Sequence, residues 1–275
     1  MAIIQDLWSE LHERNLERFL RAVEEEEPLE VLVALDFGEF GALDAAVDAA
    51  LDGIRGAQTF GMAMGAAAQI AIVVEQGWGI QLDAEADIRH EGSLTHAFEN
   101  KAASPRTLAA LWAYLAKRAG MKAHWLEMSV FHPLWIADDE SEVLVDTTSG
   151  ALVTRKDCEE IFAAITDGEE VFESAMFDRP SARDVANDTL ELRLAAATTA
   201  DDEVSAWQAM RFHAELNRDK PAIVFAAAMA ASALGEYVYA GRELKRLAVE
   251  CAGSSLEEPV RQALERLALR REYAN

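Results

Sequence analysis

A histidine and an aspartate on neighbouring predicted strands have the types and spacing to do chemistry. His132 lies in a segment of alternating pattern over residues 131–137, and Asp146 ends the next such segment, 142–146. When such side chains face each other, the carboxylate can orient and stabilise an imidazolium, as the acid does in a nucleophile–histidine–acid set. The pattern therefore predicts acyl-transfer chemistry if a nucleophile lies nearby.

The nucleophile would come from the helix that precedes these strands. Residues 105–120 predict an amphipathic helix with Ser104 as its N-cap, Pro105 at its first position and Gly120 just past its end. The helix dipole and the free N–H groups at such a start favour a developing anion. The hydroxyl groups of Ser104 and Thr107 lie at this end of the helix.

The elements around this core are mainly helical, and we expect an α+β fold. Residues 1–75 predict an N-terminal helical segment, with two of its helices at 43–54 and 62–74. In the core, 76–178, the helix is followed by an antiparallel meander. Its predicted strands are 121–130, 131–137, 142–146 and 151–154. The region 179–275 predicts five helices joined by short turns, in the manner of a tetratricopeptide-type α-hairpin array. These helices are expected at 185–198, 203–217, 221–234, 236–251 and 256–271.

The order of these motifs resembles a known family. A helix start, then His-x-x-Trp, then Leu-x-Asp-x-Thr is the skeleton of the transglutaminase-like (papain-like) core. More closely, the chain resembles the bacterial "regulator of SirC expression" family, which joins such a core to a C-terminal tetratricopeptide-like region. The matching motifs are scattered over roughly residues 70–250. They include Glu75-Gln-Gly-Trp78, Pro105, Thr107, Leu108, His132, Val145-Asp146 and Ser149-Gly150.

The resemblance implies a site made of Thr107, His132 and Asp146, with one important departure. Transglutaminases use cysteine at the position of Thr107, and the regulator family usually has serine there. A threonine hydroxyl does not form an alkoxide easily, and it acts as a nucleophile mainly when a strong base is supplied. Cys158 lies past the acid, at the start of a later helix, and fits a small buried hydrophobic residue better than a nucleophile.

Two function classes follow from this departure. In the first, a degenerate transglutaminase-like core (a pseudoenzyme) and a repeat-like helical surface bind a protein or peptide partner, in the regulatory role that the family name implies. In the second, Thr107 is the nucleophile, His132 the base and Asp146 the orienting acid in acyl transfer or amide hydrolysis. The geometry of the three side chains discriminates between the two classes.

Charge narrows the choice of partners. The chain has 275 residues, of which 25 are basic and 49 acidic, so its formal net charge is −24. Such a chain is repelled by phosphate backbones and by anionic membranes, and we expect neither nucleic acid nor membrane as a partner. The last 36 residues hold 7 basic and 6 acidic side chains, so the acidity belongs to the rest of the chain. A charged partner should therefore be basic.

The remaining signals predict a cytoplasmic protein without a cofactor or a metal. No signal peptide or stretch of spanning length is visible, and Cys158 and Cys251 lie far apart, outside any C-x-x-C motif. The histidines at positions 90, 96 and 124 lack the spacing of metal ligands on one face of a helix or strand.

Overall fold

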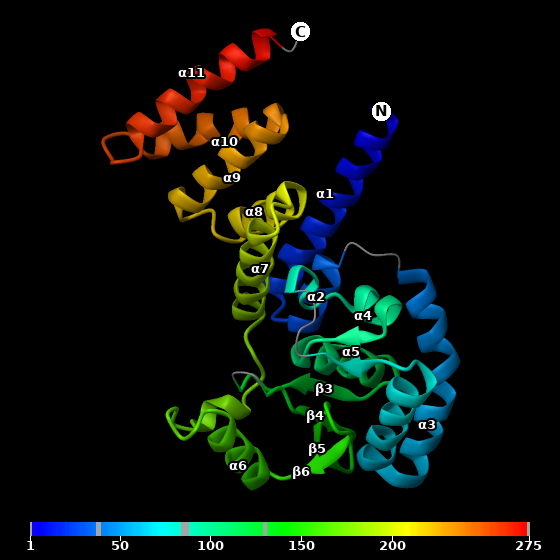
Figure 1. Cartoon of the computed structure of the whole chain (residues 1–275). Coiled ribbons are helices and arrows are strands. Elements are labelled where there is room, and N and C mark those ends of the chain that lie inside the picture. Colours follow the sequence, from blue (N-terminus) through cyan, green and yellow to red (C-terminus); the bar gives the residue numbers. More distant parts are fainter. Residues whose placement is uncertain (1, 37–39, 84–87, 129–130, 274–275) are drawn as a thin grey trace. The chain divides into compact units, whose positions relative to one another are not determined.

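The computed structural model describes residues 2–36, 40–83, 88–128 and 131–273. The chain divides into two compact units, Met1–Ala186 and Asn187–Asn275, and each is described by itself (Figure 1). None of the described helices combines the length and the apolar character needed to cross a membrane.

The first unit begins with helices, as predicted for residues 1–75. Helices α1 (Ala2–Glu24) and α2 (Pro28–Leu35) pack on each other. They are followed by α3 (Phe40–Ala71) and the short π-helix η1 (Ile72–Gly77). Helix α3 has non-helical backbone angles at Met62, with φ 54° and ψ −151°, and Figure 1 shows it as two coils running side by side. The chain thus turns back where the sequence predicted the join between two helices.

The central helix of the first unit is α5 (Pro105–Arg118), whose residues 107–116 are buried. Its ends follow the predicted signals, because the Ser104 side chain accepts a hydrogen bond from the Thr107 N–H and Pro105 opens the helix. Gly120, at φ +96°, follows the last turn in a conformation that favours glycine. Shorter elements precede α5. They are the paired strands β1 (Gln81–Leu82) and β2 (Ala102–Ala103), the 3₁₀ helix η2 (Ile88–His90) and α4 (Leu94–Asn100).

An antiparallel meander follows α5, in the order β3-β4-β5-β6. Its strands are Lys122–Trp125, Leu134–Ala137, Glu142–Asp146 and Ala151–Val153. The strand predicted at 121–130 is shorter than expected, and the next begins only at Leu134. Pro133 cannot donate to the ladder, and Met128 bonds back to Phe131 in a tight link. Residues 129–130 lie outside the described residues.

The two faces of this sheet differ. Trp125, Leu134 and Val145 are almost fully buried, and the sheet packs against α5 and α3. The opposite face carries the row His124, Trp135, Leu144 and Val153, which the strand register places side by side. Helix α6 (Arg155–Ile165) and the 3₁₀ turn η3 (Ser174–Phe177) cover the Leu144–Val153 end of this outer face.

The second unit is helical, and the five predicted helices are confirmed. They are α7 (Ala182–Thr199, which begins in the first unit), α8 (Glu203–Leu216), α9 (Pro221–Leu234), α10 (Tyr237–Glu250) and α11 (Glu257–Tyr273). Helices α8 to α11 pack in chain order around a core that includes Val224, Leu244 and Val260.

Candidate functional site

Thr107, at the start of α5, is only 3% exposed, and its hydroxyl is held in a chain of hydrogen bonds. Its Oγ1 accepts from the Gly92 N–H at 2.8 Å and lies 2.9 Å from the Ser104 Oγ. The Ser104 hydroxyl in turn lies 2.9 Å from a carboxylate oxygen of Glu91. The single proton of the Ser104 hydroxyl can be donated to the Glu91 carboxylate or to Thr107 Oγ1, and the Ser104 oxygen accepts from the Thr107 N–H at 3.2 Å. Both hydroxyl groups therefore have polar partners within the protein.

Little space remains beside the Thr107 hydroxyl. The cavity that it lines, together with Glu91, Ser93 and Ser104, has a volume of only about 10 Å³. A volume of this order holds roughly one water molecule. The start of α5 therefore has no room for an acyl substrate in this conformation.

His132 lies just before β4, is 6% exposed, and has a carboxylate neighbour. Its Nδ1 is 3.1 Å from Oε2 of Glu127, a close ion-pair contact without the alignment of a well-formed hydrogen bond. The same oxygen receives Arg106 Nη2 at 3.2 Å, and the indole of Trp125 donates to Oε1 at 2.7 Å. Burial raises the pKa of Glu127, but the contacts with His132, Arg106 and Trp125 outweigh it and hold this pKa at about 2. The carboxylate is therefore ionised at neutral pH.

Asp146, at the end of β5, makes its hydrogen bonds within the turn that follows. Its carboxylate accepts from the Thr148 N–H at 2.9 Å, from the Thr148 hydroxyl at 2.7 Å and from the Ser149 hydroxyl at 2.6 Å. The aspartate alternates with the buried Val145, so it lies on the outer face of the sheet with Leu144. What links the His132 segment to this strand end is Thr147, whose hydroxyl donates to the His132 carbonyl at 3.5 Å.

The polar contacts of two predicted residues come from nearby residues. His132 lies against Glu127, which Arg106 also contacts, and Thr107 contacts Ser104 and Gly92. Glu127 is not among the residues that the sequence pattern predicts for the site. The one available signal was a lone carboxylate between the apolar residues Trp125 and Phe131. Arg106, whose side chain is 12% exposed, is its buried partner.

Comparison with known proteins decides the family. The sequence profile of the transglutaminase-like superfamily matches residues 12–191, which is more than half of the chain. The chain therefore belongs to the transglutaminase-like superfamily. No curated protein and no solved structure matched the chain. The family match begins within α1, so the N-terminal helices are included in the transglutaminase-like domain.

The two cysteines of this transglutaminase-like protein lie outside α5, with Cys158 in α6 and Cys251 directly after α10. Cys158 and Cys251 are both buried and free. Burial, with the nearby carboxylates of Asp157 and Asp146, raises the pKa of Cys158 to about 11. A thiol with such a pKa carries almost no thiolate at neutral pH, and the thiolate is the reactive form.

The histidines at positions 90, 96 and 124 contact other rings. The rings of His90 and His96 stack at 3.8 Å between centroids, and the His124 ring lies 4.8 Å from that of Trp135. Across the described ranges, no group of three or more His, Cys, Asp or Glu side chains is placed to hold a metal ion.

Proposed function

We propose that this transglutaminase-like protein is non-catalytic and serves as a binding module for a protein or peptide partner. The observation that carries the proposal is the closed environment of the Thr107 hydroxyl. This hydroxyl accepts from Gly92, contacts Ser104 and borders a cavity of about 10 Å³. A nucleophile must meet both a base and the substrate, and these contacts leave Thr107 available to neither.

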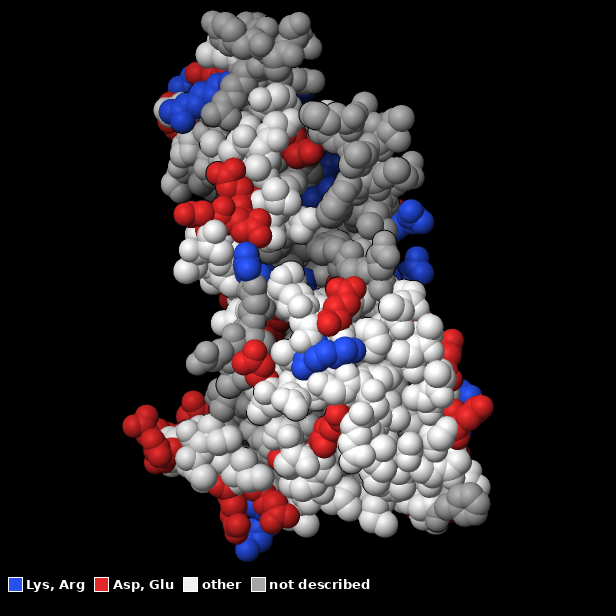
Figure 2. All heavy atoms as spheres, turned by 45° about the vertical axis from the view of Figure 1, so that its right-hand side comes forward, with Lys and Arg blue, Asp and Glu red and all other residues white. Residues whose placement is uncertain are grey.

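The resemblance to the regulator of SirC expression family supports a regulatory role, carried out in the cytoplasm of a bacterium. In this proposal the helices of residues 187–275 form a tetratricopeptide-like array that adds a second binding surface to that of the transglutaminase-like domain. The partner is basic, because the chain carries a net charge of −24. Figure 2 shows acidic side chains in separate groups over the visible face, which suits a partner with several basic residues.

The second candidate function is acyl transfer or amide hydrolysis by Thr107 and His132, with Asp146 as the orienting acid. One observation favours it. The carboxylate of Glu127 lies 3.1 Å from the imidazole and would stabilise an imidazolium, which is the task predicted for Asp146. In this version Glu127 takes the role of the acid, and a rearrangement of the segment around Gly92 must first open the start of α5.

A labelling experiment discriminates between the two functions. The 275-residue chain and its Thr107→Ala variant are treated with a fluorophosphonate probe that modifies activated hydroxyls. We expect equal background labelling, and stronger labelling of the wild type that Thr107→Ala removes would overturn the proposal. The Thr107→Cys variant measures access to this position. Its new thiol should react with iodoacetamide much more slowly in the folded protein than in the protein unfolded by urea, because position 107 is buried.

A further inference from the structure

The outer face of the sheet carries a long groove that the proposed Thr107 site does not use. One cavity of about 510 Å³ is lined by Leu126, Trp135, Glu142, Val143, Leu144, Leu152, Val153, Arg155 and Phe177. A second cavity, of about 320 Å³, is lined by Trp135 and by residues of β3, β4 and the turn before β5. Trp135 and Glu142 line both cavities, so the two form one groove with the indole at its middle. We call it the Trp135 groove.

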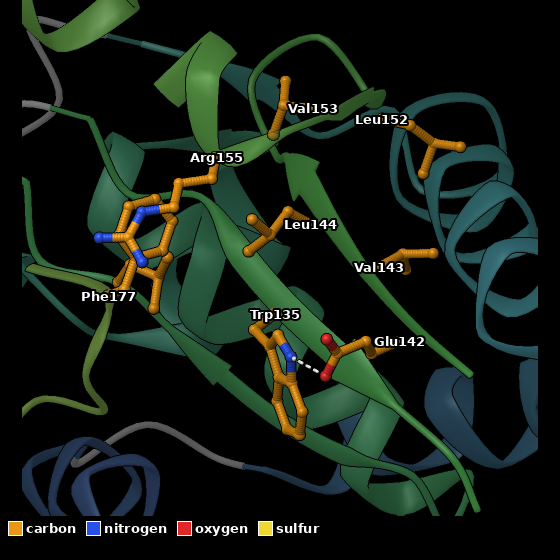
Figure 3. A pocket seen from close by; sticks show the side chains of 9 residues that line it. Trp135, Glu142, Val143, Leu144, Leu152, Val153, Arg155 and Phe177 are labelled. Atoms are coloured by element: carbon orange, nitrogen blue, oxygen red, sulfur yellow. Dashed lines mark hydrogen bonds between the residues drawn. The ribbon is translucent and has the colours of Figure 1, made fainter. Parts of the chain in front are cut away.

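The first half of the Trp135 groove is apolar because of the strand register. Trp135, Leu144 and Val153 are directly opposite one another on β4, β5 and β6, so their side chains share one face. Phe177 of η3 faces them across the groove, as Figure 3 shows. The guanidinium of Arg155 is stacked on the Phe177 ring at 4.4 Å, so this cation is engaged at the wall.

The second half of the groove is acidic. It is lined by Asp138, Glu140 and Glu142, against a single cation, Lys122. Hydrogen bonds from the Glu140 and Ser141 backbone N–H groups lower the pKa of Asp138, which keeps it ionised. Glu142 accepts the indole N–H of Trp135 at 3.1 Å, so one of its oxygens is tied to the platform at the middle of the groove.

His124 continues the row beyond Trp135 and adds no positive charge. Burial lowers its pKa to about 4, and the nearby charges of Arg179 and Lys117 contribute in the same direction. The imidazole is therefore neutral at physiological pH. Its ring lies 4.8 Å from that of Trp135, so the two rings extend the apolar platform.

We propose that the Trp135 groove binds an extended peptide segment of a partner, with a large apolar side chain in the Leu144–Phe177 half and lysine or arginine in the Asp138–Glu142 half. This inference rests on the proposed function and names where the partner binds. The volume of the Trp135 groove lies in the range of ligand sites, roughly 300–1,000 Å³, and leaves room for a few side chains. Three carboxylates against one lysine select for a basic segment, and the desolvated wall selects for an apolar anchor.

The test uses the ¹⁵N-labelled 275-residue chain and follows the indole N–H signals by NMR. The chain has 6 tryptophans, and Trp135→Phe identifies the signal of Trp135. The probe is the peptide acetyl-Phe-Ala-Lys-Lys-amide. Two matched peptides replace either both lysines by glutamate or the phenylalanine by alanine. We expect saturable shifts of the Trp135 signal with the first peptide only. The affinity obtained from these shifts should fall several-fold as the salt concentration rises from about 50 to about 300 mM.

Two variants sharpen the result. Glu142→Gln keeps an acceptor for the indole but removes a charge, so it should weaken binding by several-fold, roughly threefold to tenfold. Ile165→Ala, on the exposed end of α6 and outside the groove, should leave binding unchanged. Absence of shifts at Trp135, or equal shifts with either matched peptide, would overturn the inference.

Failure of this inference and failure of the proposed function can be told apart. Turnover at Thr107 with an intact peptide response would overturn only the non-catalytic function. Background labelling with no response at Trp135 would overturn only the groove, and would leave the helices of residues 187–275 as the place to look for the partner.

Discussion

The imidazole Nδ1 of His132 lies 3.1 Å from Oε2 of Glu127, and both residues come from one hairpin connection. Glu127 is the second residue after the end of β3, and His132 lies two residues before the start of β4. The mutual backbone hydrogen bonds of Met128 and Phe131 close the turn and bring the two side chains together. The acidic partner of this histidine is therefore local in the sequence, because it comes from the same connection between β3 and β4.

We first predict that Glu127→Gln destabilises the protein by about 2 kcal/mol, because it removes the carboxylate charge that contacts the largely buried guanidinium of Arg106. Urea unfolding followed by circular dichroism measures the change. Glu169→Gln, at an exposed position, is the matched control and should change the free energy of unfolding by less than about 0.5 kcal/mol. Equal values for the two variants would contradict the structural role of the pair.

The second prediction concerns the pH dependence of this stabilisation. The pKa of Glu127 is about 2 in the folded protein, below its ordinary value of 4.5. A depressed carboxyl pKa stabilises the folded state above the ordinary pKa, and this contribution disappears as the pH falls through the folded pKa. The difference in unfolding free energy between the wild type and Glu127→Gln should therefore be constant above about pH 5 and shrink between pH 4.5 and 2. A difference that stays constant down to pH 3 would show that the carboxylate is not held in its charged form.

The third prediction addresses Thr107. Thr107→Val keeps the shape of the side chain but removes the acceptor of the Gly92 N–H, while the Ser104 hydroxyl keeps Glu91 as a partner. An unsatisfied buried donor costs roughly 1–3 kcal/mol, so we expect a destabilisation of that order. Thr107→Ser retains the hydroxyl and should lose about 1 kcal/mol or less, through the missing methyl group. Thermal unfolding of the two variants side by side provides the measurement, and a neutral Thr107→Val would argue that the hydroxyl is free.

Local signals in the sequence predicted much of this fold. Ser104, Pro105 and Gly120 act on backbone atoms close to them in the chain, and α5 has the predicted start and ends within two residues of the predicted end. The meander and the five C-terminal helices were predicted for the same reason, since alternation and helical periodicity report local geometry. At Leu134 the prediction of the strand start was wrong, because it ignored the missing N–H of Pro133.

The candidate site depends on contacts between distant residues and was harder to predict. Arg106 meets Glu127 only because α5 packs on β3, and no periodicity encodes that pairing. Likewise, whether Asp146 faces the helix or the outer side of the sheet is decided by strand register, since a shift of one residue reverses every side chain. The burial of Thr107 depends on Gly92 and Glu91, which precede α4.

The fourth prediction is that His124 titrates far below an ordinary histidine. Burial, then Arg179 and Lys117, lower its pKa from 6.5 to about 4. A histidine with a depressed pKa in the folded state is neutral in the native protein and takes up a proton on unfolding. Because this proton stabilises the unfolded state, the free energy of unfolding should decrease as the pH falls from about 6.5 to 4. NMR titration of the ring protons measures this pKa directly. Arg179→Ala should raise the value while leaving it below 6.5, because burial is the larger cause. A pKa near 6.5 in the wild type would mean that the His124 ring is exposed to solvent. This result would contradict its burial beside Trp135.

The fifth prediction tests the reversal of α3 at Met62 with two glycines of the same helix. A Cβ at Gly65 would collide with the backbone carbonyl of Ala57, whereas at Gly56 it would meet nothing within 4 Å. We expect Gly65→Ala to destabilise the protein by about 2 kcal/mol and Gly56→Ala to stabilise it by about 0.5–1 kcal/mol, measured by urea unfolding. In a straight helix, residues 57 and 65 would lie roughly 12 Å apart along the axis and could not touch. Stabilisation by both substitutions would therefore mean that α3 does not fold back. It would also contradict the hydrogen bond that the Ala63 N–H donates to the Ser141 hydroxyl at 3.0 Å, since this N–H lies at the reversal.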